Sequence, residues 1–218
     1  MNKNKRNFLI SAILILCSAI FTILVKVVDV EKIGDTNTEV GFSSVNQYIF
    51  NLTGVNMIWY HITDWLGILP ILLAFVYAFV GAYQLIKRRG LFKVDKEILL
   101  LGVFYIITLS TYIFFESVVI NCRPVLINGY LEASYPSSHT VMTLCLCISS
   151  IMVNKRLFAS KFTKVIDVAS IIIISVTVIG RLISGVHWFT DILGGILISA
   201  SLLMVYYSVI SSEFFVEK

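Results

Sequence analysis

Hydrophobic positions along this chain are gathered into long blocks, and short polar segments separate them. A helix needs about 20 mostly apolar residues to cross the hydrocarbon core of a bilayer. Six blocks approach that length, and both the fourth and the fifth are expected to extend into their flanking residues. The pattern predicts an all-α, polytopic membrane protein, with residues 1–218 as a single membrane-embedded domain. Its six transmembrane helices cover approximately Phe8–Val28, Leu66–Ile86, Ile98–Val119, His139–Val153, Val165–Ile179 and Trp188–Ile210.

Composition supports this prediction. Hydrophobic residues make up 58% of the chain and charged residues 14%, whereas a soluble domain has roughly 45–50% and 25%. A soluble globular domain and a disordered chain are both excluded. The four cysteines show no metal-binding spacing, so neither a disulfide framework nor a zinc site is indicated. The first block follows a basic start, like a signal peptide, but it is too long and lacks a cleavage site, so we interpret it as a retained span.

The distribution of basic residues predicts the orientation of the helices. If the N-terminus is cytoplasmic, 13 of the 17 basic residues fall on the inner side, and Lys26, Lys32, Arg123 and Arg181 remain outside. Such a bias over short loops follows the positive-inside rule. Both termini are therefore expected in the cytoplasm. Because topology explains the basic residues, we expect membrane lipids and no nucleic acid as partners.

The first outer loop, about Asp29 to Trp65, is the longest. Its middle, Val40 to Leu52, is expected to form a short amphipathic helix on the membrane surface. Further on, His61 and Asp64 are three residues apart among aromatic residues, where they can touch on a helix. We interpret this pair as an interfacial anchor, with a role at the substrate entrance as the alternative.

Ionisable residues at a membrane edge are costly and suggest function. In the segment from Arg181 to Asp191, His187 and Asp191 are four residues apart and would share one helical face. A carboxylate behind an imidazole fixes its tautomer and stabilises its protonated form, which suits a base or a nucleophile. The alternative is a polar pair that only packs two helices together.

A second segment, Pro136-Ser137-Ser138-His139, stands directly before an apolar helix. Ser137 or Ser138 can cap that helix, and its free backbone N–H groups make an anion site. His139 in the first turn would lie beside a bound anion. Taken alone, an ordinary cap with an interfacial histidine remains the alternative.

Arg123 and Arg181 are expected at the same depth as these histidines. Two guanidinium groups form a planar, multidentate clamp for phosphate oxygens. Two histidines, one of them backed by an aspartate, supply a nucleophile and a general acid. Together the residues predict phosphoryl transfer from a phosphate ester through a phosphohistidine.

These residues resemble the phosphatidic acid phosphatase type 2 superfamily of membrane phosphatases. Its first motif has a lysine seven residues before Arg-Pro, its second is Pro-Ser-Gly-His, and its third is Ser-Arg, five residues, His, three residues, Asp. The spacings match over about residues 116–195, with Glu116 in place of the lysine, Ser138 in place of the glycine and Gly180 in place of the serine. The six-span plan with a site on the outer face matches as well.

The resemblance implies a role for each matching residue. His187 would be the nucleophile, Asp191 its orienting partner and His139 the acid that protonates the leaving oxygen. The phosphate would be held by Arg123, Arg181, Ser137 and Ser138. No metal or other cofactor is expected, because the arginines neutralise the phosphate charge. No phosphate-binding role is carried over to Glu116, which reverses the charge of the family's lysine.

The expected substrate is a lipid phosphate, and isoprenyl diphosphate, phosphatidic acid and phosphatidylglycerol phosphate all remain open. The absence of extra domains suggests a bacterial plasma membrane protein with its site facing outside. A lipid phosphotransferase of the same fold, a transporter and a non-enzymatic lipid-binding protein are the alternatives. Phosphate release by the purified protein distinguishes the enzyme from the last two. The sequence does not predict an oligomeric state.

Overall fold

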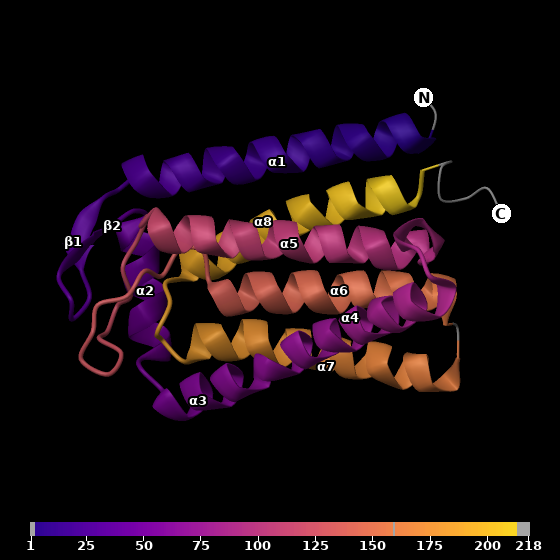
Figure 1. The fold of residues 1–218 in the computed structure, drawn as a ribbon. Helices are drawn as coiled ribbons and strands as arrows, with labels where there is room; N and C mark the ends of the chain where they lie inside the picture. Colours follow the sequence, from indigo (N-terminus) through magenta and orange to yellow (C-terminus); the bar gives the residue numbers. More distant parts are fainter. Residues whose placement is uncertain (1–2, 159, 213–218) are drawn as a thin grey trace.

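Six long apolar helices run alternately up and down in one bundle (Figure 1). The computed structural model describes residues 3–158 and 160–212. Each helix is long and apolar enough to cross a bilayer, which confirms the predicted six-span plan. The helices of the bundle are α1 (Lys3–Val27), α3 and α4 (Met57–Leu66 and Ile68–Arg88), α5 (Lys96–Ser117), α6 (Ser138–Leu157), α7 (Lys161–Ile183) and α8 (Phe189–Ile210).

The second span differs from its predicted bounds. It begins at Met57, nine residues before the predicted start, because α3 and α4 follow one another with only Gly67 between them. Because α3 contains polar residues, the sequence did not show this segment as part of the apolar block. The fourth and fifth spans extend beyond their predicted ends, as expected.

The long segment between α1 and α3 is folded at one end of the bundle. It contains a two-stranded antiparallel hairpin, β1 (Glu31–Ile33) and β2 (Thr38–Val40), in a segment where the sequence predicts a loop. Helix α2 (Ser43–Thr53) confirms the helix expected over residues 40–52. Asn46 of α2 donates to the Thr190 hydroxyl at 2.9 Å and accepts from its backbone N–H at 3.1 Å, which ties α2 to the start of α8.

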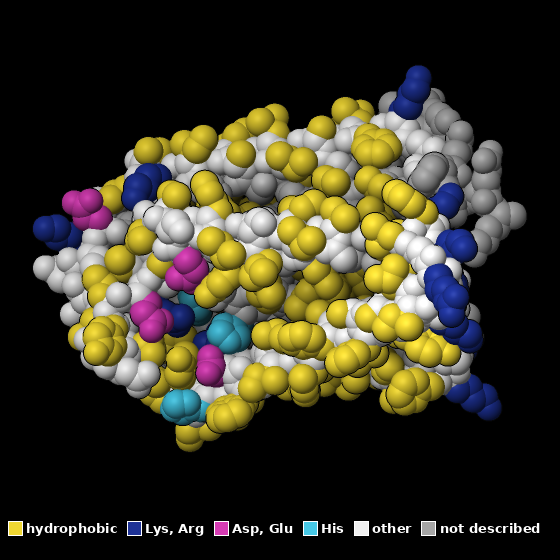
Figure 2. Space-filling model, in the orientation of Figure 1, with side chains coloured by type: hydrophobic (Ala, Val, Ile, Leu, Met, Phe, Trp, Pro, Cys, Tyr) yellow, Lys and Arg dark blue, Asp and Glu magenta, His cyan; other side chains and the backbone are white. Residues whose placement is uncertain are grey.

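The two ends of the bundle carry different side chains. Lysine and arginine gather at the end where α1 begins and α8 ends, close to the short 3₁₀ helix η1 (Leu91–Lys93) (Figure 2). Histidine and acidic side chains lie at the opposite end, with the hairpin and α2. A band of exposed apolar side chains covers the surface between the ends. We call the end with the hairpin the hairpin end.

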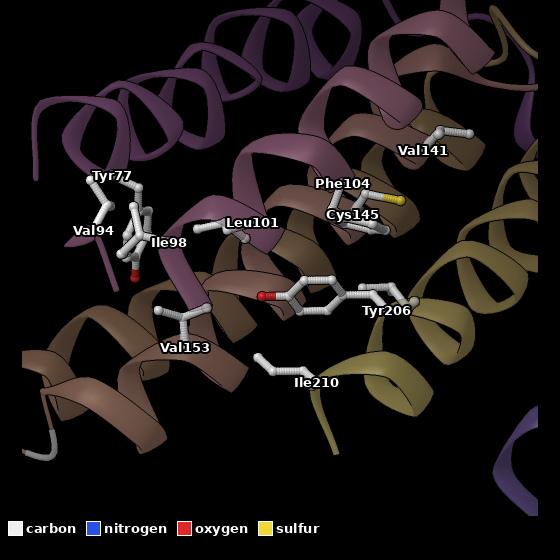
Figure 3. Close-up of a cluster of buried hydrophobic side chains, with 11 residues drawn as sticks. Tyr77, Val94, Ile98, Leu101, Phe104, Val141, Cys145, Val153, Tyr206 and Ile210 are labelled. Atoms are coloured by element: carbon white, nitrogen blue, oxygen red, sulfur yellow. The ribbon is translucent and has the colours of Figure 1, made fainter. Parts of the chain in front are cut away.

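Hydroxyl groups and a hydrophobic core hold the helices together. Helix α1 packs antiparallel to α8, where Ser11 and Ser208 are hydrogen-bonded at 2.9 Å and Ser18 and Ser201 at 3.3 Å. Small hydroxyl residues allow close approach of helices in membranes. The core of buried side chains comes from α4, α5, α6 and α8, with Phe104 and Tyr206 packed at its centre (Figure 3).

Candidate active site

The structure brings the three motif segments together at the hairpin end. Arg123 lies in the segment between α5 and α6, which folds back on itself through a β-bridge between Cys122 and Ala133. The second segment begins α6, and the third joins the end of α7 to the start of α8. Two adjacent glycines in α8 allow these segments to approach one another closely. The Tyr135 ring packs on Gly194, and Thr140 of α6 packs on Gly195.

His187 is almost completely buried and is held by a backbone carbonyl. Its Nδ1 lies 3.1 Å from the carbonyl oxygen of Ser134, and a carbonyl can only accept a hydrogen bond. The proton of the neutral ring therefore resides on Nδ1, and Nε2 keeps its lone pair. Nε2 is buried without a hydrogen-bond partner among the described residues. This tautomer presents a free nucleophilic nitrogen to the site.

The environment also keeps this ring neutral. Burial lowers the pKa of His187 well below its ordinary value of 6.5, and the charges of Arg123 and Arg181 lower it further. An imidazole must be neutral to act as a nucleophile. His187 therefore remains in its reactive form at neutral pH.

Asp191 contacts His187 less directly than the sequence analysis expected. Helix α8 begins at Phe189, so His187 precedes the helix and does not share a helical face with Asp191. The Asp191 carboxylate accepts the Trp188 backbone N–H at 2.9 Å and lies 3.7 Å from His187 Nδ1. Asn121 also donates to it, at 3.3 Å. The Ser134 carbonyl orients the imidazole, while Asp191 fixes the helix start and lies behind the ring.

Arg181, in the last turn of α7, is fully buried. Its Nη2 donates to Asp64 Oδ1 at 3.1 Å, and its guanidinium lies 5.2 Å from the centre of the Tyr60 ring. Nε and Nη1 are buried without hydrogen-bond partners among the described residues. Since a buried donor without a partner is unfavourable, these two groups are suited to an anionic ligand.

Arg123 has a similar arrangement on the other side of the site. Its Nε lies 2.9 Å from Glu132 Oε2, and its backbone N–H donates to the Glu132 carbonyl at 3.0 Å. Its Nη1 is buried without a hydrogen-bond partner in the described part of the chain. Each arginine thus pairs with one carboxylate and retains at least one unpaired N–H.

The start of α6 differs in detail from the expected cap. Ser137 is the capping residue by position, but its side chain makes no capping hydrogen bond, and its Oγ accepts from the Thr140 hydroxyl at 3.1 Å. The first helical hydrogen bond runs from Val141 N–H to the Ser137 carbonyl. The N–H groups of the preceding residues, Ser138 included, lie outside the helical ladder, which is the arrangement that lets helix starts bind anions.

His139, in the first turn of α6, contacts a residue that no motif contains. Its Nε2 lies 3.2 Å from Asp64 Oδ1. The His61 ring packs on Tyr60, while Asp64 lies between His139 and Arg181. The sequence offered only one signal for Asp64, a carboxylate at the edge of an apolar span.

Two cavities adjoin these residues. A small one is lined by Glu116, Ser138 and His187, so Glu116 reaches the site from the last turn of α5. A larger one, of about 500 Å³, extends from Asp64 and His139 between α4, α5 and α6. Most of its wall is apolar, from Trp65, Ile68, Ile71, Leu109 and Met142. The site therefore adjoins a cavity suited to a hydrocarbon chain.

Comparison with known proteins gives the family of this chain. The family model of the PAP2 superfamily matches residues 71–214. The chain belongs to the PAP2 superfamily, and it is a membrane protein of that superfamily. No significant match to a curated protein was found.

A solved structure has the same fold. It is described as the first transmembrane PAP2 type phosphatidylglycerolphosphate phosphatase from Bacillus subtilis. The sequences are 19% identical, the match covers 94% of this chain and 98% of that chain, and the TM-score is 0.57. At this identity the likeness establishes the shared fold.

The fold gives one departure from the family motifs a physical reason. A Cβ atom at Gly180 would lie 2.5 Å from Thr63 Cγ2 and 3.0 Å from the Trp59 ring. Helix α3 thus occupies the space that the family's serine side chain would need. The same helix supplies Tyr60 and Asp64 to Arg181.

Proposed function

We propose that this protein is a membrane phosphatase that hydrolyses a lipid phosphate through a phosphohistidine at His187. One observation carries this proposal: at one site lie buried nitrogen atoms that have no hydrogen-bond partner among the described residues. They are Arg123 Nη1, Arg181 Nε, Arg181 Nη1 and His187 Nε2. Three of these are cationic N–H donors, and the fourth is a nucleophile. A phosphate group, with several anionic oxygens around an electrophilic phosphorus, satisfies all four.

The first step transfers the phosphoryl group to the protein. The lone pair of His187 Nε2 attacks phosphorus, a P–N bond forms, and the P–O bond to the lipid breaks. His139 gives its proton to the leaving oxygen, which departs as an alcohol or, from a diphosphate, as a lipid monophosphate. Asp191, 3.7 Å behind the His187 ring, stabilises the positive charge that develops there.

The second step regenerates the site. Water attacks the phosphohistidine, and His139, now neutral, takes a proton from this water. The P–N bond breaks, its electrons return to Nε2, and inorganic phosphate leaves. Arg123, Arg181, Ser137 and the Ser138 N–H hold the phosphoryl oxygens in both steps. Two guanidinium groups supply charge neutralisation, so the proposed reaction uses no metal ion.

The substrate is proposed to be an amphiphile with a terminal phosphate. The apolar cavity beside His139 is suited to its hydrocarbon chain. Isoprenyl diphosphate, phosphatidic acid and phosphatidylglycerol phosphate all have this chemistry, and the last is the substrate named for the structural neighbour. Residues 1–218 would act as one phosphatase domain. A phosphotransferase would use the same first step with another acceptor in place of water.

The proposed location is a bacterial plasma membrane, with the site outside. The basic residues at the end opposite the site support this orientation under the positive-inside rule. Both termini are then cytoplasmic.

The test is phosphate release by the purified protein in detergent from the three lipids, with water-soluble phosphates as controls. We expect release from at least one lipid, and no release by His187→Ala. The functional proposal fails if the folded wild-type protein releases no phosphate from any of them. An acceptor-dependent transfer without free phosphate would identify a phosphotransferase.

A further inference from the structure

Helix α3 brings a carboxylate into the site from outside the family's motifs. Asp64 Oδ1 lies 3.2 Å from His139 Nε2 and 3.1 Å from Arg181 Nη2. The family model matches residues 71–214, so Asp64 precedes the matched part of the chain. One oxygen of Asp64 thus lies close both to His139, the proposed general acid, and to Arg181, which is proposed to bind the phosphate.

This contact depends on close packing on both sides of Asp64. At Gly180 of α7, a Cβ atom would meet Thr63, and at Gly67 a Cβ atom would lie 2.8 Å from Cδ2 of His139. The Tyr60 ring covers the Arg181 guanidinium. Two glycines therefore allow α3 and its junction with α4 to approach the site closely, and Asp64 has a defined position.

The chemistry of the first step requires a proton on His139. The ring is three-quarters buried and faces two cations, Arg181 and Arg123, which oppose a further positive charge. His187 also faces the ring, and Tyr112 lines the adjoining cavity. Asp64 supplies a negative charge at ion-pair distance from His139 Nε2. Nδ1, buried without a partner in the described residues, remains as the second proton-carrying atom.

We propose that Asp64 is a positioning residue that holds His139 by Nε2 in its protonated form, so that Nδ1 gives its proton to the leaving oxygen. The two histidines are then held in opposite ways. The Ser134 carbonyl holds His187 at Nδ1 and leaves Nε2 to attack phosphorus. Asp64 holds His139 at Nε2 and leaves Nδ1 to protonate the oxygen.

This proposal rests on the proposed phosphatase function, and its test uses the leaving group. A general acid matters for a poor leaving group and little for a good one, with typical contributions of about 10²- to 10⁴-fold. The substrates are dodecyl phosphate and a nitrophenyl phosphate that carries the same dodecyl chain. The variants are Asp64→Asn, Asp64→Glu and, as a matched control, Asp35→Asn at an exposed aspartate of the hairpin.

We expect Asp64→Asn to lower kcat for the alkyl phosphate by about 10²-fold or more, and for the aryl phosphate by less than about fivefold. The alkaline limb of kcat for the alkyl phosphate should move to lower pH. Asp64→Glu should recover part of the alkyl activity, and Asp35→Asn should match the wild type. If Asp64→Asn does not fold, Gly180→Ala displaces α3 with all charges retained, and the same selective loss is expected.

Equal losses with both substrates, without recovery in Asp64→Glu, would overturn the proposal. So would tighter inhibition of Asp64→Asn by inorganic phosphate with no dependence on the leaving group, because Asp64 would then only compete for Arg181. Failure of the phosphatase function itself would be distinct, because the wild type would release phosphate from neither substrate.

Discussion

Replacing Gly180 by the serine of the family motif should impair this protein. The new Cβ would lie 2.5 Å from Thr63 Cγ2, whereas carbon atoms in contact are about 3.5–4.0 Å apart. Helix α3 must therefore move by about 1 Å. Overpacking of this kind costs about 1–3 kcal/mol of stability, and a displacement of about 1 Å in a catalytic group can lower turnover about 10²-fold.

The measurement combines thermal unfolding in detergent with phosphate release from a lipid phosphate. We expect Gly180→Ser to unfold at a lower temperature and to lose about 10- to 10²-fold in kcat. Thr63→Ser removes the obstructing methyl group, so the double variant should recover part of both losses. Wild-type stability and activity in Gly180→Ser would refute the reasoning, and α3 would then not be packed against Gly180.

Four other results are expected. His187→Ala should abolish turnover and remain folded, because it removes the nucleophile; residual turnover equal to the wild type in a lipid phosphate assay would exclude this role. EDTA should not inhibit phosphate release, since Arg123 and Arg181 neutralise the phosphate; inhibition reversed by one divalent ion would contradict this mechanism. Glu116→Lys should stay active and lower KM by about fivefold, because a new ion pair between the lysine and the phosphate at an exposed position contributes about 1 kcal/mol. A folded variant without activity would contradict this prediction. Because burial lowers the pKa of His187 well below 6.5, its ring stays neutral as the pH falls from 7.5 to 6. Protonation of His187 should therefore cause no decrease in kcat near pH 6.5 at saturating substrate.

Sequence patterns predicted the parts of this protein that depend on solvent and on local spacing. A bilayer requires about 20 apolar residues per helix, so the six spans could be predicted from the apolar blocks along the chain. The positions of Arg181 and His187 followed from local spacing near the ends of two spans. The start of α8 at Phe189 did not, because the spacing from His187 to Asp191 is equally compatible with a helix that begins earlier.

The contacts that sequence analysis missed join distant parts of the chain. Asp64 contacts Arg181, 117 residues away, and no local pattern encodes that pairing. The partner of His187 Nδ1 is the main-chain carbonyl of Ser134, and a carbonyl is present at every residue. The hairpin strands are three residues long, too short for an alternating pattern. Each of these features is set by tertiary packing.

The pairing of α1 with α8 has a consequence for how the protein is made. Helix α1 leaves the ribosome before α8, against which it packs through Ser11 with Ser208 and Ser18 with Ser201. Near the other end of α1, Thr22 is hydrogen-bonded at 2.7 Å to Tyr135, which packs on Gly194 of α8. Helix α1 therefore lacks its packing partner in the membrane until α8 has been inserted. The site is completed only when the bundle closes, because a nascent chain that stops before α8 lacks Asp191 and the glycine on which Tyr135 packs.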